Sequence, residues 1–289
     1  MKKLTSLLLT GALALGLLAG CSTSTGGDTG TPQSSSPAQP SASGSLEGTT
    51  ITVAASPTPH AEILAVARDV LAQQGITLEI MEFTDYIQPN LATEEGEVDA
   101  NYFQHITYLN DFNEGNGTHL VSVAEIHYEP FGIYAGTTSS LADLPDGAKI
   151  GVPNDPSNEG RALLLLQQEG LITLKEGVGL TATKLDIAEN PKNLQIEELE
   201  AAQLPRSLDS LDLAVINGNY ALQAGLNAAD ALAIESTDGE ATQAYVNVLA
   251  VKEGRENDPA IQALVEALKS DEVKSFMEET WPNAVVPMF

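Results

Sequence analysis

The clearest chemistry in this sequence lies in the segment VPNDPSNEGR, which ends at Arg161. Asp155 is a good N-cap and Pro156 a good first helical residue, so a helix is expected to begin here. A helix N-terminus receives anions well, and Arg161, on the same helix face as Asn158, can hold a carboxylate by two parallel hydrogen bonds. The segment therefore predicts a carboxylate-binding site, with an exposed arginine near a helix cap as the alternative.

Two earlier segments carry aromatic side chains near expected strand ends, where open α/β sheets bind ligands. In DANYFQHITY, Phe103 and His105 share one side at strand spacing, and Tyr108 lies three residues beyond His105. Tyr86, in FTDYIQPN, follows an expected strand and precedes a proline-marked turn. Converging rings suit a soft side chain such as a thioether, which contacts ring edges favourably. The alternative, which the pattern alone favours, is an aromatic core cluster with a hydrogen-bonded histidine.

Asparagines at two apolar strands need polar partners. Asn217 follows the run LAVI, and Asn247 lies inside the run YVNVLAV. A buried amide without hydrogen bonds is costly, so each requires a partner from the protein or from a ligand. Turn capping would explain Asn217 and the nearby Asn219, whereas Asn247 is harder to explain in that way.

Sequence signals for enzymes and metal sites are missing. The chain contains no GxSxG, HExxH or DxDxDG motif, and its four histidines show no metal-ligand spacing: His60, His105, His119 and His127. We therefore predict no catalytic residue, no metal and no cofactor. An extracellular enzyme and an adhesin are kept as alternatives from other functional classes.

Strand and helix signals alternate along the chain. Strands are expected at 50–55, 76–83, 98–103, 149–153, 212–216 and 245–251, with one long extended segment at 120–134. Helices are expected at 61–74, 107–113 and 157–169, from 220 onward, and from about 259 to 281. This alternation predicts an α/β fold with open, mainly parallel sheets and helices on both faces.

These elements are expected to form two lobes joined by two chain crossings. The first lobe is predicted to comprise residues 49–135 and 240–289, and the second residues 136–239. The C-terminal tail is expected to return to the first lobe and to contribute helices but no further strand. Two lobes with two crossings form a hinged cleft that can enclose a small ligand.

The N-terminus predicts export and a lipid anchor. Lys2 and Lys3 precede an apolar run that is too short for a permanent membrane span, so residues 1–20 are interpreted as a secretory signal. The following LAGC resembles the lipobox of bacterial lipoproteins, in which Cys21 is acylated. Residues 21–48, rich in Ser, Thr, Gly and Pro, predict a disordered tether. The alternative is a soluble secreted protein with one stray cysteine.

The chain is strongly acidic, with 13 Lys and Arg against 40 Asp and Glu and a formal net charge of −27. That balance argues against electrostatic binding to nucleic acid or to an anionic membrane surface. The acidic residues are spread along the chain rather than clustered, so they are interpreted as a solvated surface.

Six segments together resemble the NlpA family of lipoproteins, the methionine-binding proteins of ABC importers. In the family's order, the matching segments are FTDYIQPN, DANYFQH, VPNDPSNEGRALLLLQ, ENPKNLQIEELEAAQLPRSLD, LAVINGNYA and YVN. The resemblance implies a two-lobed, type II-like periplasmic-binding-protein fold that closes on its ligand, and it implies no enzymatic activity. The implied partners are the membrane subunits of an ABC transporter, with the chain lipid-anchored at the extracytoplasmic face of the cell membrane.

By motif match, the resemblance also implies a role for each candidate residue. Tyr86, Phe103, His105 and Tyr108 would line the side-chain pocket, Arg161 would bind the ligand carboxylate with Asn158 nearby, and Asn217 and Asn247 would hold the amino-acid backbone. The implied ligand is L-methionine, with a methionine-containing dipeptide or another small amino acid as the alternative. The chain departs from the family pattern at Gly218 and Asn219 and in its long tether.

Overall fold

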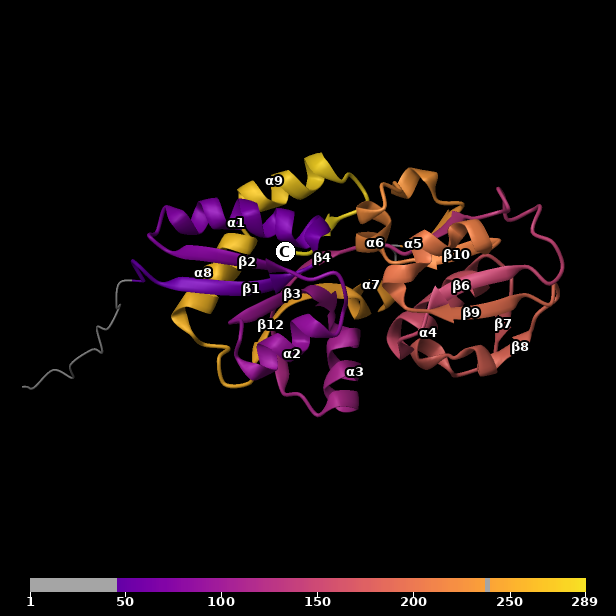
Figure 1. Cartoon of the computed structure of the whole chain (residues 1–289), viewed down its shortest axis with the longest axis horizontal. Helices are drawn as coiled ribbons and strands as arrows, with labels where there is room; N and C mark the ends of the chain where they lie inside the picture. Colours follow the sequence, from indigo (N-terminus) through magenta and orange to yellow (C-terminus); the bar gives the residue numbers. More distant parts are fainter. Residues whose placement is uncertain (1–45, 237–239) are drawn as a thin grey trace, which may run out of the picture. The chain divides into compact units, whose positions relative to one another are not determined.

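The computed structural model of the chain describes residues 46–236 and 240–289 (Figure 1). The predicted signal at 1–20, the candidate lipidation site Cys21 and the predicted tether up to residue 45 lie outside the described residues. Within the part of the chain that is described, no helix is both long enough and apolar enough to cross a membrane.

A six-stranded sheet forms the first lobe, in the order β13-β4-β12-β3-β1-β2. Its strands are β1 (Thr50–Ala55), β2 (Thr77–Glu82), β3 (Ala100–His105), β4 (Leu120–Tyr128), β12 (Val246–Lys252) and β13 (Val286–Pro287). β1 pairs in parallel with β2 and β3, whereas β12 runs antiparallel to β3 and β4, and β13 runs antiparallel to β4. The sheet is mixed, so the prediction of a mainly parallel sheet is wrong for this lobe.

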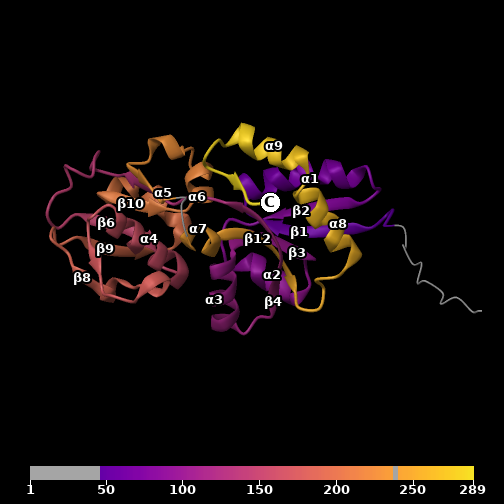
Figure 2. The same cartoon turned by 180° about the vertical axis from the view of Figure 1, so that it is seen from behind.

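Five helices cover the two faces of this sheet: α1 (Glu62–Ala72), α2 (Gln88–Glu95), α3 (Ile106–Asn116), α8 (Pro259–Leu268) and α9 (Asp271–Thr280) (Figures 1 and 2). α1, α8 and α9 share one core with Val53 of β1. On the other face, α2 packs near Ala54, and Leu109 of α3 packs near Val248. Successive strand residues point to opposite faces, which is why Val53 and Ala54 belong to different cores.

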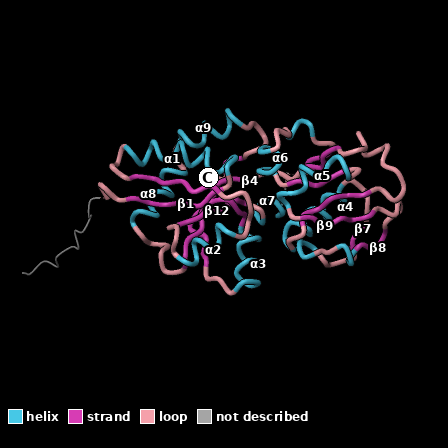
Figure 3. Tube along the Cα trace, viewed as in Figure 1, coloured by secondary structure: helices cyan, strands magenta, loops and turns pink. Residues whose placement is uncertain are grey.

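A five-stranded sheet forms the second lobe, in the order β11-β5-β10-β6-β9. The strands are drawn in magenta in Figure 3. Its strands are β5 (Gly132–Ala135), β6 (Lys149–Pro153), β9 (Gln195–Leu199), β10 (Leu213–Ile216) and β11 (Ala233–Ile234). The further elements are α4 (Pro156–Gln168), α5 (Leu204–Ser207), α6 (Gly218–Gln223), α7 (Glu240–Ala244) and the small pair β7 (Thr173–Leu174) and β8 (Ile187–Glu189). β6 is parallel to β9 and β10, but β5 is antiparallel to β10 and β11, so this sheet is also mixed.

The chain passes from the first sheet to the second through residues 129–131, between β4 and β5. The extended segment predicted at 120–134 is therefore two strands of different sheets, because Pro130 has no N–H with which to continue a ladder. The predicted lobe boundary at residue 135 placed β5 in the first lobe, whereas β5 pairs in the second sheet. The return passes through residues 235–245, and the predicted boundary at 239 falls at residues 237–239, outside the described residues.

The C-terminal tail packs on the first lobe, as predicted, with α8 and α9 in its core. The prediction that the tail adds no strand is wrong. β13 pairs Val286 with Tyr128 and Pro287 with His127, at the edge of the first sheet. Two residues are too few to show the alternation that reveals a strand, so only the pairing with β4 identifies β13.

Candidate functional site

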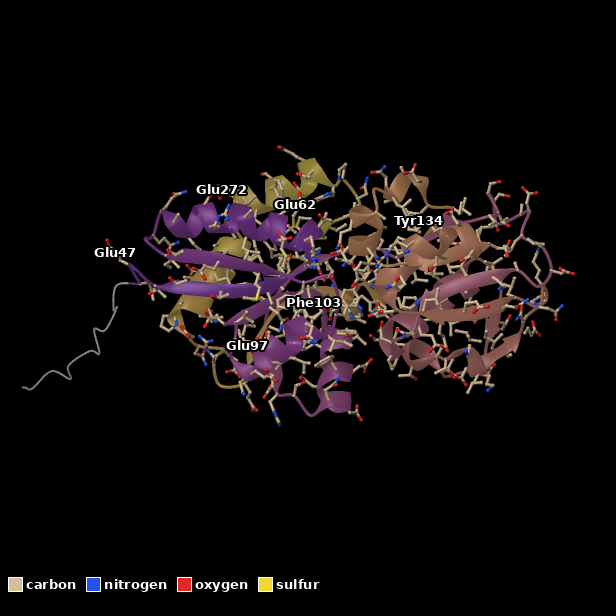
Figure 4. All side chains as sticks on the ribbon, in the orientation of Figure 1. Glu47, Glu62, Glu97, Phe103, Tyr134 and Glu272 are labelled. Atoms are coloured by element: carbon tan, nitrogen blue, oxygen red, sulfur yellow. The ribbon has the colours of Figure 1, made fainter. Side chains whose placement is uncertain are left out.

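A pocket between the two sheets is lined by side chains from both lobes. All eight residues that the sequence predicted to bind a ligand line this pocket: Tyr86, Phe103, His105, Tyr108, Asn158, Arg161, Asn217 and Asn247. Phe103, on β3, is labelled in Figure 4. Five further lining residues were not predicted: Gln104, Glu129, Phe131, Gly218 and Asn219. The fold thus gathers residues that are separated by up to 161 positions in the sequence.

Aromatic rings of the first lobe form one side of the pocket. The ring centroid of Tyr86 lies 5.8 Å from that of Phe103 and 5.5 Å from that of Tyr108, and the last two are 6.3 Å apart. Tyr86 also packs against Tyr220 of the second lobe at 4.9 Å. Such a set of tilted and edge-on rings offers a soft, apolar surface to a ligand side chain.

Tyrosine hydroxyls join the two lobes beside this pocket. The hydroxyl of Tyr86 donates to Asn219 Oδ1 at 2.6 Å, and the hydroxyl of Tyr220 donates to the carbonyl of Thr84 at 3.2 Å. The hydroxyl of Tyr108, by contrast, donates to the Tyr86 carbonyl at 3.1 Å within the first lobe. The first two bonds cross between the lobes and so hold the pocket closed.

A chain of hydrogen bonds that begins at Asp155 orients the amides of the pocket. Asp155 caps α4 by accepting from the Asn158 N–H at 3.0 Å, and both its carboxylate oxygens accept from Asn158 Nδ2, at 2.8 and 3.0 Å. The Oδ1 of Asn158 therefore faces away from Asp155, and it accepts from Asn217 Nδ2 at 3.0 Å. Asn217 Oδ1 is left buried and without a hydrogen-bond partner among the described residues. That oxygen is an acceptor available to a donor on a ligand.

His105 joins this series of hydrogen bonds as a neutral donor. Its Nδ1 accepts from the N–H of Tyr108 at 3.1 Å, which makes it the N-cap of α3. Its proton is therefore on Nε2, which lies 3.1 Å from Asn158 Oδ1. Burial, helped by the nearby positive charge of Arg161, lowers the pKa of His105 to about 3. The imidazole is thus uncharged at neutral pH, and a hydrogen bond at each ring nitrogen fixes its orientation.

Arg161 is buried in an ion pair. It is 2% exposed; its Nε donates to Glu235 Oε1 at 3.0 Å and its Nη2 donates to Glu235 Oε2 at 2.6 Å. Nη2 also donates to the carbonyl of Glu129 at 2.7 Å, and the guanidinium lies over the rings of Phe131 and Tyr245 at 4.0 and 4.2 Å. The guanidinium edge that carries Nε and Nη2 was expected to hold a ligand carboxylate by two parallel hydrogen bonds, but Glu235 occupies it. Nη1 has no hydrogen-bond partner within the described part of the chain.

The Arg161–Glu235 pair stays ionised. Burial alone would lower the pKa of Arg161, but the carboxylate of Glu235 outweighs burial and raises it. Burial alone would raise the pKa of Glu235, but Arg161 outweighs burial and lowers it. Glu235 was not predicted as the partner of Arg161, because nothing in its local sequence, AIESTDG, indicates an ion pair.

Three residues of metal-ligand type also meet next to the pocket: His60, His127 and Glu129, whose ligand atoms lie within 4.8 Å of one another. Their spacing in the sequence does not indicate that these three side chains lie together. His127 Nε2 is 2.7 Å from Glu129 Oε1, which is a hydrogen-bond distance. Two ligands of one tetrahedral zinc ion, each about 2.1 Å from the metal, are separated by roughly 3.4 Å. The geometry is therefore that of a hydrogen-bonded network.

Comparisons with known proteins place the chain in a family. The sequence model of the NlpA lipoprotein family matches residues 51–289. The methionine-binding lipoprotein MetQ of Bacillus subtilis is 40% identical over 289 residues, covering 97% of this chain and 98% of the relative. A crystal structure of a lipoprotein from Ruminococcus gnavus is 58% identical, with a TM-score of 0.82, covering 83% of this chain and 99% of that one. A nutrient-binding protein from Burkholderia cenocepacia, solved bound to methionine, is 45% identical, with a TM-score of 0.79, covering 83% of this chain and 100% of that one. The chain therefore belongs to the NlpA lipoprotein family.

Proposed function

We propose that this protein is the substrate-binding lipoprotein of an ABC importer and that it captures L-methionine outside the cytoplasmic membrane. Its activity would be binding and delivery, without bond making. The observation that carries the proposal is the buried, unpartnered acceptor Asn217 Oδ1 in a pocket that also contains the buried, unpartnered donor Asn219 Nδ2.

The polar groups of the pocket complement an α-amino acid. Its ammonium group donates hydrogen bonds and its carboxylate accepts them. Asn217 Oδ1 offers an acceptor and Asn219 Nδ2 a donor, both buried and without a partner among the described residues. Arg161 and Asn247 line the same pocket and carry further N–H donors. A buried polar group left unsatisfied costs about 1–3 kcal/mol, and a bound amino acid would remove that cost.

The apolar side of the pocket favours methionine. A thioether packs well against the edges of aromatic rings such as those of Tyr86, Phe103 and Tyr108. The names of the Bacillus and Burkholderia relatives support methionine as the ligand.

Closure around the ligand would follow from the two-lobed construction. The first crossing, residues 129–131, connects the two sheets and would act as part of the hinge. A ligand that contacts both lobes favours the closed state, because only that state offers both sets of contacts. The closed, loaded protein would then dock on the membrane subunits of the importer.

Membrane attachment would come from the N-terminus. The LAGC segment and the lipoprotein family support acylation of Cys21 after removal of residues 1–20, with the protein held at the extracytoplasmic face. Two or more acyl chains provide the double signal that stable anchoring needs. Metabolic labelling with a palmitate analogue, lost in Cys21→Ser, would test this attachment.

Thermal unfolding tests the ligand. Residues 46–289 would be unfolded and refolded to remove bound ligand, and then heated with L-methionine, D-methionine, methionine dipeptides or unrelated amino acids. A ligand at 1,000 times its Kd stabilises a fold by about 4 kcal/mol, so L-methionine is expected to raise the melting temperature by several degrees. Asn217→Ala should remove most of that rise, whereas the exposed Asn257→Ala should keep it. A flat response to every methionine compound would overturn the ligand assignment.

A further inference from the structure

We propose that His60 is a positioning residue of this ligand site, holding the side-chain amide of Asn247 so that its nitrogen faces the ligand. The inference rests on the proposed binding function and extends it to a residue outside the pocket wall. His60 lies in the short helical turn η1 (Pro57–Ala61) after β1, is 1% exposed and does not line the pocket. It can therefore act on a ligand only through its neighbours.

The ring of His60 is held in one orientation by what surrounds it. It meets the ring of Tyr102 edge-on at 4.8 Å and that of His127 at 5.0 Å. Its Nε2 lies 3.0 Å from Asn247 Oδ1 and 3.4 Å from Glu129 Oε1. A carboxylate oxygen accepts hydrogen bonds, so the nitrogen facing Glu129 carries the proton. Burial lowers the pKa of His60 to about 4, so the ring is neutral at pH 7 and that proton is its only one.

The proton on Nε2 decides which end of the Asn247 amide faces the pocket. The N–H of His60 requires an acceptor, so Asn247 must turn its Oδ1 toward His60. Its Nδ2 then points away from His60 and makes no hydrogen bond to a described residue, while Asn247 itself lines the pocket. A donor is what a carboxylate needs. If the amide rotated by half a turn, it would present an oxygen to the same carboxylate and repel it.

His60 also connects the two chain crossings beside the pocket. Glu129 lies in the first crossing, and Asn247 follows the second, near the start of β12. Glu129 is held in turn by His127 Nε2 at 2.7 Å, and the hydroxyl of Tyr102 contacts His127 Nδ1 at 2.5 Å. His60, Tyr102 and His127 all belong to the first lobe. Through them, this network fixes Glu129 and Asn247, one beside each crossing, to the same lobe.

The experiment compares L-methionine with L-methioninamide, whose neutral amide replaces the carboxylate, by calorimetric titration of the ligand-free full chain. His60→Leu is expected to weaken L-methionine binding at least tenfold and to reduce the preference for the carboxylate over the amide at least tenfold. His60→Gln retains an N–H donor and should keep both values within about threefold of wild type. The exposed His119→Leu is the matched control and should change neither value.

A double-mutant cycle separates positioning from a general loss of stability. In an Asn247→Ala background, His60→Leu should add less than a twofold loss of affinity, because the amide that it positions is gone. A full, additive loss in that background, or an unchanged carboxylate preference in His60→Leu, would overturn the inference.

The ligand-free protein gives an independent test. In ¹⁵N NMR spectra at pH 7, His60 should be neutral with its proton on Nε2, whereas a proton on Nδ1 would overturn the inference even if His60→Leu does not fold. A wild-type chain that binds no methionine would instead overturn the proposed function, and the tautomer of His60 would still decide this inference.

Discussion

Arg161 on α4 and Glu235 at the start of the return crossing form a buried ion pair, with Nε–Oε1 and Nη2–Oε2 distances of 3.0 and 2.6 Å. The charge of Arg161 is therefore neutralised within the protein. A zwitterionic amino acid carries no net charge, so it can bind beside Arg161 without requiring this pair to separate.

Removing one partner of this pair should be costly. Arg161→Ala leaves the Glu235 carboxylate buried and uncompensated, and the free energy of unfolding is expected to fall by about 3–5 kcal/mol. Urea unfolding of the ligand-free chain measures this change. The double variant Arg161→Met with Glu235→Met should regain much of the stability. Neither variant is expected to bind methionine, because both lack the guanidinium group. A cost below about 1 kcal/mol for Arg161→Ala would contradict the buried pair.

The Tyr86 hydroxyl should contribute to closure. Tyr86→Phe removes the 2.6 Å bond to Asn219 that crosses between the lobes, and one hydrogen bond is worth about 0.5–1.5 kcal/mol. The Kd for methionine is therefore expected to rise roughly 2- to 12-fold in calorimetric titration. Tyr134→Phe, which alters a hydroxyl outside the pocket, is the control and should leave the Kd unchanged. Equal Kd values for Tyr86→Phe and wild type would exclude this contribution.

Gly218 should not tolerate a side chain. A Cβ at this position would lie 2.7 Å from Glu129 Oε2 and 2.8 Å from Glu129 Cβ, so the carboxylate would have to move. Gly218→Ala is expected to cost about 1–3 kcal/mol of stability and to weaken methionine binding. Gly115→Ala in α3, where a Cβ meets nothing within 4 Å, should leave binding intact and stabilise slightly. The prediction fails if both variants unfold at the same urea concentration as wild type.

Stability should fall as the pH is lowered from 6.5. Burial lowers the pKa of His60 to about 4 and that of His105 and His127 to about 3, from an ordinary value of 6.5. The unfolded chain therefore binds more protons, and the stabilisation present above pH 6.5 is lost as the pH falls toward 4. For three such groups the loss between pH 6.5 and 5.5 is about 3 kcal/mol.

Urea unfolding at a series of pH values checks this dependence. Burial raises the pKa of Glu129, which acts in the opposite direction, so wild type is compared with a histidine variant at each pH. His60→Gln should reduce the slope by about one proton. The exposed His119→Gln should leave the slope unchanged. A stability that does not vary between pH 7.5 and 5.5 would show that these histidines are not held neutral.

Local sequence signals found much of the site because each depends on near neighbours. Asp155 caps α4 as expected, and the spacing of Asn158 and Arg161 on that helix places both at the pocket. Tyr86, Phe103 and Tyr108 also line the pocket, although the pattern of Phe103 and Tyr108 alone favoured an aromatic core cluster and only the family resemblance implied a pocket role. Helix starts are short-range features, so the sequence by itself determined the start of α4 and the α/β class.

Only the tertiary structure decided which distant groups meet. Glu235 reaches Arg161 across 74 positions, and His60 reaches Asn247 across 187, so no local pattern could pair them. Strand direction also escaped prediction, because it depends on how the chain enters a sheet: β12 returns through the second crossing and therefore runs antiparallel to β3. A buried charge or amide is satisfied by whatever group the fold brings within about 3 Å, and that distance is a property of the packed chain.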